Sequence, residues 1–353
     1  MRWIWPAVIL VVAVILLLTY GPKKAIAPKQ ETVLKTEKTK VTNPLYISYV
    51  INTGEASFNS LKAHAGLFNL VIADWLHLDG KDGLLREDNQ EKQKVILEYI
   101  RESNKKAKVF VMLNNYARGW QVENTKAMLS NPTAREKVVV SVLEYVKKNN
   151  LDGVSLDFEQ VPKGSQKDYV SFLSELVKQI HAINKEVSVH VPADDPSWDY
   201  SGIAKVVDQV IVMIYDEHFS ITEAGPIASL SWTEDVLKKR TQEIPFNKLI
   251  IGMGNYAYDW QGAKGSSITY SSAKALADKY GKRLLTNDVF QNNYFEYADS
   301  LGNKHIVWVL DEYSVAMQKR AAAKYAPLGY ALYRLGSEDP QVWQTFVSPG
   351  RTD

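Results

Sequence analysis

The sequence predicts an α/β fold, a parallel (β/α)8 TIM barrel, and two observations carry this prediction. From Leu45 onward, short β-rich runs alternate with helical stretches, which is the pattern of a parallel sheet. The β-rich runs number eight, and eight strands close a barrel of this type. A chain of 353 residues is long enough for one such domain.

The strands and helices are expected at defined places. The eight strands are predicted at Leu45–Ile51, Asn69–Leu76, Val109–Asn114, Val154–Glu159, Val187–Val191, Gln209–Tyr215, Leu249–Asn255 and Gly329–Leu335. The clearest helices between them are Asn89–Asn104, Thr133–Lys148 and Lys167–Asn184. In the last of these, apolar residues recur on one face, as helical periodicity requires.

About 70 residues separate the seventh and eighth strands, far more than an ordinary connection needs. Within them the pattern predicts a helix at Ser272–Tyr280 and two strands at Tyr294–Ala298 and Ile306–Leu310. We therefore expect a small α+β insertion at about 260–311. A helix at Val315–Tyr325 should then lead back to the last strand.

The two ends differ from the rest of the chain. Ala7–Thr19 is an unbroken apolar run of a length between a signal-peptide core and a full membrane span. Residues 1–20 are predicted to be a membrane anchor, and a signal cleaved near Ala27 is the alternative, which Lys23 and Lys24 disfavour. Residues 21–44 should form a flexible tether, 45–346 the barrel and 347–353 a short tail.

Composition excludes several classes of function. The net charge of +2, without a basic cluster interleaved with aromatic residues, argues against nucleic acid as a partner. The absence of cysteine excludes disulfides, thiolate nucleophiles and zinc–thiolate sites. The six histidines show no paired ligand spacing, so we expect neither a metal nor another cofactor. Nothing in the sequence indicates an oligomeric state.

The stretch around the fourth strand carries the strongest chemical signal. Alternate side chains of a strand point to opposite faces, so one face is wholly apolar and the other holds Ser155, Asp157 and Glu159. Parallel barrels keep their chemistry at the carboxyl ends of the strands, where the two acids stand. A solvated acidic strand end without a role is the alternative. Two acids on one strand are also too close together to act from opposite sides of a substrate bond.

Asp152-Gly153 followed by Asp157-Phe158-Glu159 resembles the strand-four signature of glycoside hydrolase family 18. The family usually has Asp or Asn where this chain has Ser155. Met213-Ile214-Tyr215-Asp216 is similar to the end of that family's sixth strand. The resemblance runs from about Leu45 to Trp343.

The resemblance implies a retaining, substrate-assisted hydrolysis of glycan that contains N-acetylglucosamine, such as peptidoglycan, an exopolysaccharide or a chitin-like polymer. Glu159 would be the general acid and later the base, Asp157 would orient the acetamido group, and Tyr215 would position its oxygen. The further residues expected to bind substrate are Asp216, Tyr333, Ser155, Trp75, Asn114 and His218. Trp120, Trp198 and Trp260 also lie at or just past strand ends and are candidate sugar platforms, with core packing as the alternative, whereas His190 is expected in the core.

The last strand and the residues after it, Gly329 to Pro340, resemble bacterial envelope and spore-associated members of the family. They also resemble family-18-like domains fused to polysaccharide deacetylase and glycosyltransferase modules. Those proteins usually carry Trp at the position of Tyr333, and chitinases commonly have Ser-x-Gly-Gly where this chain has Asn114-Asn115-Tyr116.

These departures keep a second function open, a glycan-binding barrel at the cell envelope with little or no catalysis. A purely structural envelope scaffold is a third reading, which Asp157, Glu159 and Tyr215 together disfavour. In each case we expect the folded domain outside the cytoplasm, anchored to the membrane, or secreted if the N-terminal segment is cleaved.

Overall fold

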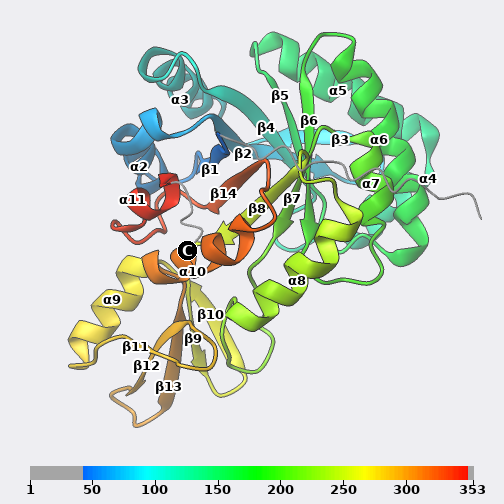
Figure 1. Cartoon of the computed structure of the whole chain (residues 1–353). Helices are drawn as coiled ribbons and strands as arrows, with labels where there is room; N and C mark the ends of the chain where they lie inside the picture. Colours follow the sequence, from blue (N-terminus) through cyan, green and yellow to red (C-terminus); the bar gives the residue numbers. More distant parts are fainter. Residues whose placement is uncertain (1–42, 349–353) are drawn as a thin grey trace, which may run out of the picture. The chain divides into compact units, whose positions relative to one another are not determined.

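In the computed structural model, residues 43–348 are described, and they contain a closed barrel of eight parallel strands (Figure 1). These strands are β1 (Leu45–Ile51), β2 (Leu70–Asp79), β4 (Lys108–Asn114), β5 (Gly153–Asp157), β6 (Glu186–Pro192), β7 (Gln209–Met213), β8 (Leu249–Gly254) and β14 (Gly329–Tyr333). They are neighbours in chain order, and β1 pairs with both β14 and β2, which closes the ring. The predicted barrel and its eight strands are confirmed.

Helices cover the outside of the barrel (Figure 1). They are α2 (Ala56–His64), α3 (Gln90–Ser103), α4 (Val122–Ser130), α5 (Pro132–Lys148), α6 (Gln166–His181), α7 (Tyr200–Val206), α8 (Leu230–Glu243), α10 (Glu312–Ala323) and α11 (Val342–Val347). Helix α6 ends three residues earlier than the sequence pattern predicts, because the chain turns toward β6 at Asn184, which has a left-handed φ of 57°. The short strand β3 (Leu84–Glu87), antiparallel to β2, was not predicted.

The two faces of β5 divide as alternation requires. Val154, Leu156 and Phe158 pack in the core between strands and helices. The opposite face begins at Gly153, where an added Cβ would lie 2.3 Å from the carbonyl oxygen of Glu186 and 2.7 Å from the Phe110 ring. Since Phe110 fills the barrel interior at this level, the polar residues of β5 are left to the upper part of the strand.

The insertion lies between β8 and β14 and forms a five-stranded antiparallel sheet in the order β10-β9-β13-β12-β11. Its elements are β9 (Ala257–Gln261), β10 (Lys264–Ile268), α9 (Tyr270–Lys279), β11 (Leu285–Thr286), β12 (Asn293–Ala298) and β13 (Lys304–Val309). The predicted helix and two strands are present. Strands β9, β10 and β11 were missed, and in β10 the Gly- and Ser-rich sequence has little strand propensity of its own, so it depends on pairing with β9.

The predicted anchor, nearly all of the tether and most of the C-terminal tail lie outside the described residues. Within residues 43–348, no helix is long and apolar enough to cross a membrane. The anchor therefore stays a prediction from the sequence.

Candidate active site

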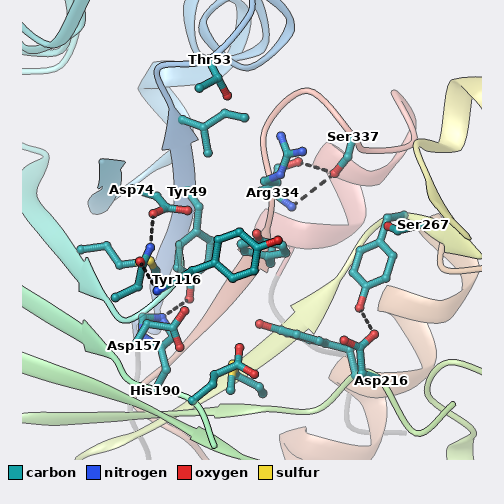
Figure 2. Close-up of a pocket in the computed structure, with 18 of the residues that line it drawn as sticks. Tyr49, Thr53, Asp74, Tyr116, Asp157, His190, Asp216, Ser267, Arg334 and Ser337 are labelled. Atoms are coloured by element: carbon teal, nitrogen blue, oxygen red, sulfur yellow. Dashed lines mark hydrogen bonds between the residues drawn. The ribbon is translucent and has the colours of Figure 1, made fainter. Parts of the chain in front are cut away.

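A cavity of about 500 Å³ opens at the carboxyl ends of the barrel strands (Figure 2). Nearly every barrel strand contributes a side chain from its middle or its carboxyl-terminal half: Tyr49, Asp74, Asn114, Asp157, His190, Met213 and Tyr333. The insertion adds Tyr258 and Ser267 to Thr269 on one side. The insertion thus walls part of the cavity.

Asp157 is the last residue of β5, and its side chain points into the cavity (Figure 2). Only 9% of the residue is exposed. One of its carboxyl oxygens, Oδ1, is buried and has no hydrogen-bond partner among the described residues. Buried polar atoms are nearly always paired, so this oxygen is an acceptor that a bound molecule can satisfy.

Glu159 follows Asp157 on the same face, and its backbone is held in place from the neighbouring strand end. The Asn115 side chain accepts a hydrogen bond from the Glu159 amide at 2.9 Å and donates one to the Glu159 carbonyl at 3.0 Å. Asn115 also donates to the hydroxyl of Thr125, which is buried on α4. This double contact aims the Glu159 side chain into the cavity.

Both carboxyl groups hold their protons more tightly than usual. Burial raises the pKa of Asp157 to about 7. Burial also raises the pKa of Glu159 well above its ordinary value, and the charges of Asp157 and Asp216 act in the same direction. A carboxyl group protonated near neutral pH is what a general acid requires.

Tyr215 and Asp216 follow β7 and face the same cavity. The Tyr215 ring stacks on Tyr333 with centroids 6.0 Å apart. Asp216 has a left-handed φ of 62°, and its carboxylate accepts a hydrogen bond from Tyr256. Burial raises the pKa of Asp216 to about 6, against the opposing effect of the Tyr256 bond. The two residues are therefore joined to β14 and to the start of the insertion.

Asn114, predicted as a substrate-binding residue, lines the cavity and orients a residue that the sequence analysis missed. Its Nδ2 donates to Oδ1 of Asp74 at 2.9 Å, while its own oxygen lies 2.7 Å from Nδ1 of His77. Burial and the neighbouring charge of Asp157 raise the pKa of Asp74 to about 6. One signal was available: Leu70, Ile72 and Asp74 alternate onto the inner face of β2.

Tyr49 and His190 form the inner end of the cavity, and Tyr333 lies beside them. The Tyr49 hydroxyl and Nε2 of His190 are 2.9 Å apart, and the Tyr49 and Tyr333 rings pack edge to face at 5.4 Å. Burial lowers the pKa of His190 to about 4, so the imidazole is neutral. Tyr49 was not singled out in the sequence, and His190, expected in the core, is buried and also lines the cavity.

Three predicted substrate-binding residues lie away from the cavity lining. Trp75 is fully buried on the outer face of β2, because Asp74 takes the inward position, and its Nε1 donates to the Tyr145 hydroxyl at 2.9 Å. Ser155 is fully buried below Asp157 and accepts a hydrogen bond from Ser188 at 2.7 Å. His218 instead contacts the carbonyl of Pro226 with Nδ1 at 2.9 Å.

Of the other candidate platforms, only Trp120 reaches the cavity, where its ring packs edge to face on Tyr116 at 5.0 Å. Trp198 and Trp260 are buried, at 7% and 0% exposure, within apolar clusters. Aromatic residues at strand ends serve packing more often than binding, which sequence position alone does not reveal. In residues 43–348, no three His, Asp or Glu side chains are grouped to hold a metal ion.

A family model, glycosyl hydrolases family 18, matches residues 44–346. The chain belongs to this family. That span contains the whole barrel, the insertion and every residue of the cavity. Family membership and the paired acids at the end of β5 together make the protein a glycosidase by class.

The relatives agree with this assignment. Over 308 residues the chain is 30% identical to the uncharacterized glycosylase YvbX of Bacillus subtilis, which covers 83% of this chain and 88% of that protein. A chitinase from Chromobacterium violaceum superimposes with a TM-score of 0.79 at 24% identity, covering 88% of this chain and 99% of that one. The spore cortex-lytic enzyme SleL of Bacillus megaterium superimposes with a TM-score of 0.77 at 21% identity, covering 89% of this chain and 75% of that one. At these identities the two solved structures show the shared fold alone.

Proposed function

We propose that this family 18 glycosidase hydrolyses glycan containing N-acetylglucosamine, with retention of configuration and with the acetamido group of the substrate as the nucleophile. The observation that carries the proposal is the buried, unpartnered Oδ1 of Asp157 beside Glu159. An acetamido N–H is a hydrogen-bond donor that would satisfy this oxygen. The same bond would turn the acetamido oxygen toward the anomeric carbon.

The steps follow from the groups in the cavity. Glu159, kept protonated by its raised pKa, gives its proton to the glycosidic oxygen as that bond breaks. The acetamido oxygen forms a bond to the anomeric carbon, which leaves a positively charged oxazolinium ring next to Asp157. Glu159 then takes a proton from water, and the water oxygen opens the ring at the anomeric carbon. Tyr215 holds the acetamido oxygen throughout.

The other carboxyl groups of the cavity are already hydrogen-bonded to side chains, which supports this division of roles. Asp74 accepts from Asn114, Asp88 is paired with His77 and Arg86, and Asp216 accepts from Tyr256. None of these three is free to attack the substrate. Asp157 and Glu159 come from the same strand end rather than from opposite sides of the cavity, so Asp157 is not placed as a nucleophile opposite Glu159.

A glycan-binding barrel without catalysis is the second candidate, and one observation favours it. The hydroxyl of Ser155 is engaged with Ser188 in the barrel interior and offers no acidic proton to Asp157. The glycosidase proposal therefore requires that Asp157 act without a carboxyl partner on its own strand.

The mechanism predicts that glycan lacking acetyl groups is inert, because a free amine has no carbonyl oxygen to attack. We expect turnover of N-acetylglucosamine hexamer, measured by product chromatography, and none of the fully de-N-acetylated hexamer. A stable thiazoline mimic of the oxazolinium should inhibit competitively, because it resembles the charged intermediate. Rapid cleavage at a de-N-acetylated unit, or a covalent glycosyl–Asp157 adduct seen by mass spectrometry, would contradict the proposal.

We also propose that the folded domain lies outside the cytoplasm on an uncleaved N-terminal anchor, which the apolar run Ala7–Thr19 supports. The full chain should then fractionate with membranes, and a chain that starts at Asn43 should remain in the soluble fraction. Protease added to intact cells should reach the domain through residues 21–44. A soluble mature form whose N-terminus is at or near Pro28 would show a cleaved signal instead.

A further inference from the structure

Arg334 is the only lysine or arginine among the residues that line the cavity in the described part of the chain. It directly follows Tyr333 at the end of β14 and is half-buried. Figure 2 shows its guanidinium directed toward the side of the cavity where Thr53 lies. The positive charge is thus one residue away from the ring expected to support the reacting sugar.

The guanidinium of Arg334 makes no hydrogen bond or ion pair with any residue of 43–348, and the hydrogen bonds of this residue are those of its backbone to Ser337. The nearest acid in sequence, Glu338, is engaged with Ser60 and with the Gly336 amide. An arginine stays charged at every relevant pH, and partly buried charges are usually paired. Among residues 43–348, however, this guanidinium has no counter-ion.

The backbone that carries Arg334 is nevertheless fixed. The Ser337 hydroxyl lies 2.9 Å from the Arg334 carbonyl oxygen and 3.0 Å from that of Asn255. Asn255 in turn accepts a hydrogen bond from the amide of Asp339. The backbone of Arg334 is therefore fixed while its guanidinium is free to bind a ligand. Such a residue is preorganised, because little further ordering is needed on binding.

The acidic residues of the cavity do not prevent an anion from binding there. Burial raises the pKa of Asp157 to about 7 and that of Asp74 to about 6, so both are partly protonated near neutral pH. The charge of Arg334 acts in the opposite direction and lowers the pKa of Asp74. A negative group beside Arg334 would therefore meet one full positive charge, and the raised pKa values weaken the repulsion from Asp157 and Asp74.

We propose that Arg334 binds a carboxylate on the sugar adjoining the reacting N-acetylglucosamine, so that the preferred glycan is acidic. This inference rests on the proposed function and narrows its substrate class. The planar guanidinium matches a carboxylate with two parallel hydrogen bonds, a fit that the hydroxyls of a neutral chitin-like chain do not offer. The carboxylate has two chemical sources, the lactyl group of muramic acid freed of its peptide, or a uronic acid.

The test compares substrates that differ only in this charge. Glycan strands of alternating N-acetylglucosamine and muramic acid, stripped of peptide, are assayed with the full chain before and after their lactyl carboxyls are amidated. A polymer alternating N-acetylglucosamine with glucuronate examines the second source. Neutral N-acetylglucosamine hexamer serves as the reference. The variants are Arg334→Gln and Arg334→Lys, with Arg283→Gln, an exposed arginine of the insertion, as the matched control.

For the wild type, we expect kcat/KM on one of the acidic polymers to exceed that on the amidated strands by about 10- to 100-fold, the range for one charge-assisted pair. Arg334→Gln should bring the ratio of kcat/KM on acidic to amidated strands to about 1, Arg334→Lys should keep part of the preference, and Arg283→Gln should leave it as in the wild type. Equal losses on acidic and neutral glycans, or no wild-type preference for acidic ones, would overturn the proposal. If no glycan is turned over, the proposed function fails, and the same comparison made by binding affinity decides the role of Arg334.

Discussion

Glu159→Gln is expected to lower glycan turnover by at least ~10²-fold, because the amide cannot deliver the proton that the leaving oxygen needs. Glutamine keeps the shape of the side chain, and the Asn115 contacts involve only the backbone of residue 159, so the cavity should stay intact. Binding of the hexamer should therefore persist. The measurements are initial rates on N-acetylglucosamine hexamer and its affinity by calorimetry.

Glu123→Gln is the matched control, since Glu123 is exposed in the first turn of α4 and does not line the cavity. It should behave as the wild type. If Glu159→Gln retained full turnover, the acid would have to be another group. If the wild type bound glycan but never cleaved it, the binding-barrel reading would replace the glycosidase proposal.

Asp157→Asn is expected to lower the rate by about 10² to 10³-fold and at the same time to stabilise the folded protein above neutral pH. The rate falls because the positively charged intermediate loses the carboxylate beside it, an electrostatic loss of the size seen when one preorganised group is removed. The stability rises because an ionised, buried carboxylate with an unpartnered oxygen is costly, and asparagine removes its charge.

The pH range of the stability effect follows from the direction of the shift. The pKa of Asp157 is raised by burial from 3.8 in the unfolded chain to about 7 in the folded protein. Below pH 4 the carboxyl group of Asp157 is protonated in both the folded and the unfolded protein, and its contribution to the free energy of unfolding is fully present. This contribution is lost progressively as the pH rises through 7, because the unfolded chain releases the proton more readily than the folded protein. The gain from Asp157→Asn should therefore be small at pH 4 and on the order of 2–4 kcal/mol at pH 8.

Urea unfolding of the wild type and of Asp157→Asn between pH 4 and 8 measures this difference. Tyr215→Phe is a suitable control, because it should lower the rate without a pH-dependent change in stability, as no carboxyl group is removed. In the pH–rate profile of Asp157→Asn, the alkaline limb should move to lower pH. The charge of Asp157 helps to raise the pKa of Glu159, and the substitution removes that charge. A stability gain of equal size at pH 4 and 8 would show that charge is not the cause.

Much of the fold could be predicted from the sequence because the signals are local. Two-residue alternation places Val154, Leu156 and Phe158 on one face and the acids on the other, whatever the neighbouring strands are. The same alternation brings Asp157 and Glu159 to one strand end. Local patterns did not reveal β10, whose Gly- and Ser-rich residues become a strand only through pairing with β9.

The site required more than local pattern. Asp74, Tyr49 and His190 carry no motif, and they meet Asp157 only because eight strands close into a ring that brings their upper ends to one opening. Trp75 stands beside a strand end in the chain, yet the inward turn of Asp74 leaves it facing the helices.

The sequence alone thus determined which residues share a face, since alternation is a property of one strand. Only the tertiary structure decided how high each inward side chain lies in the barrel and what stands across from it. Ser155 shows the difference: its face was predicted, but the pairing of β5 with β6 sets it level with Ser188, below the cavity. Arg334 shows the same difference. No sequence pattern indicates that its charge lacks a partner, because the formation of an ion pair depends on which distant segments of the chain meet in the fold.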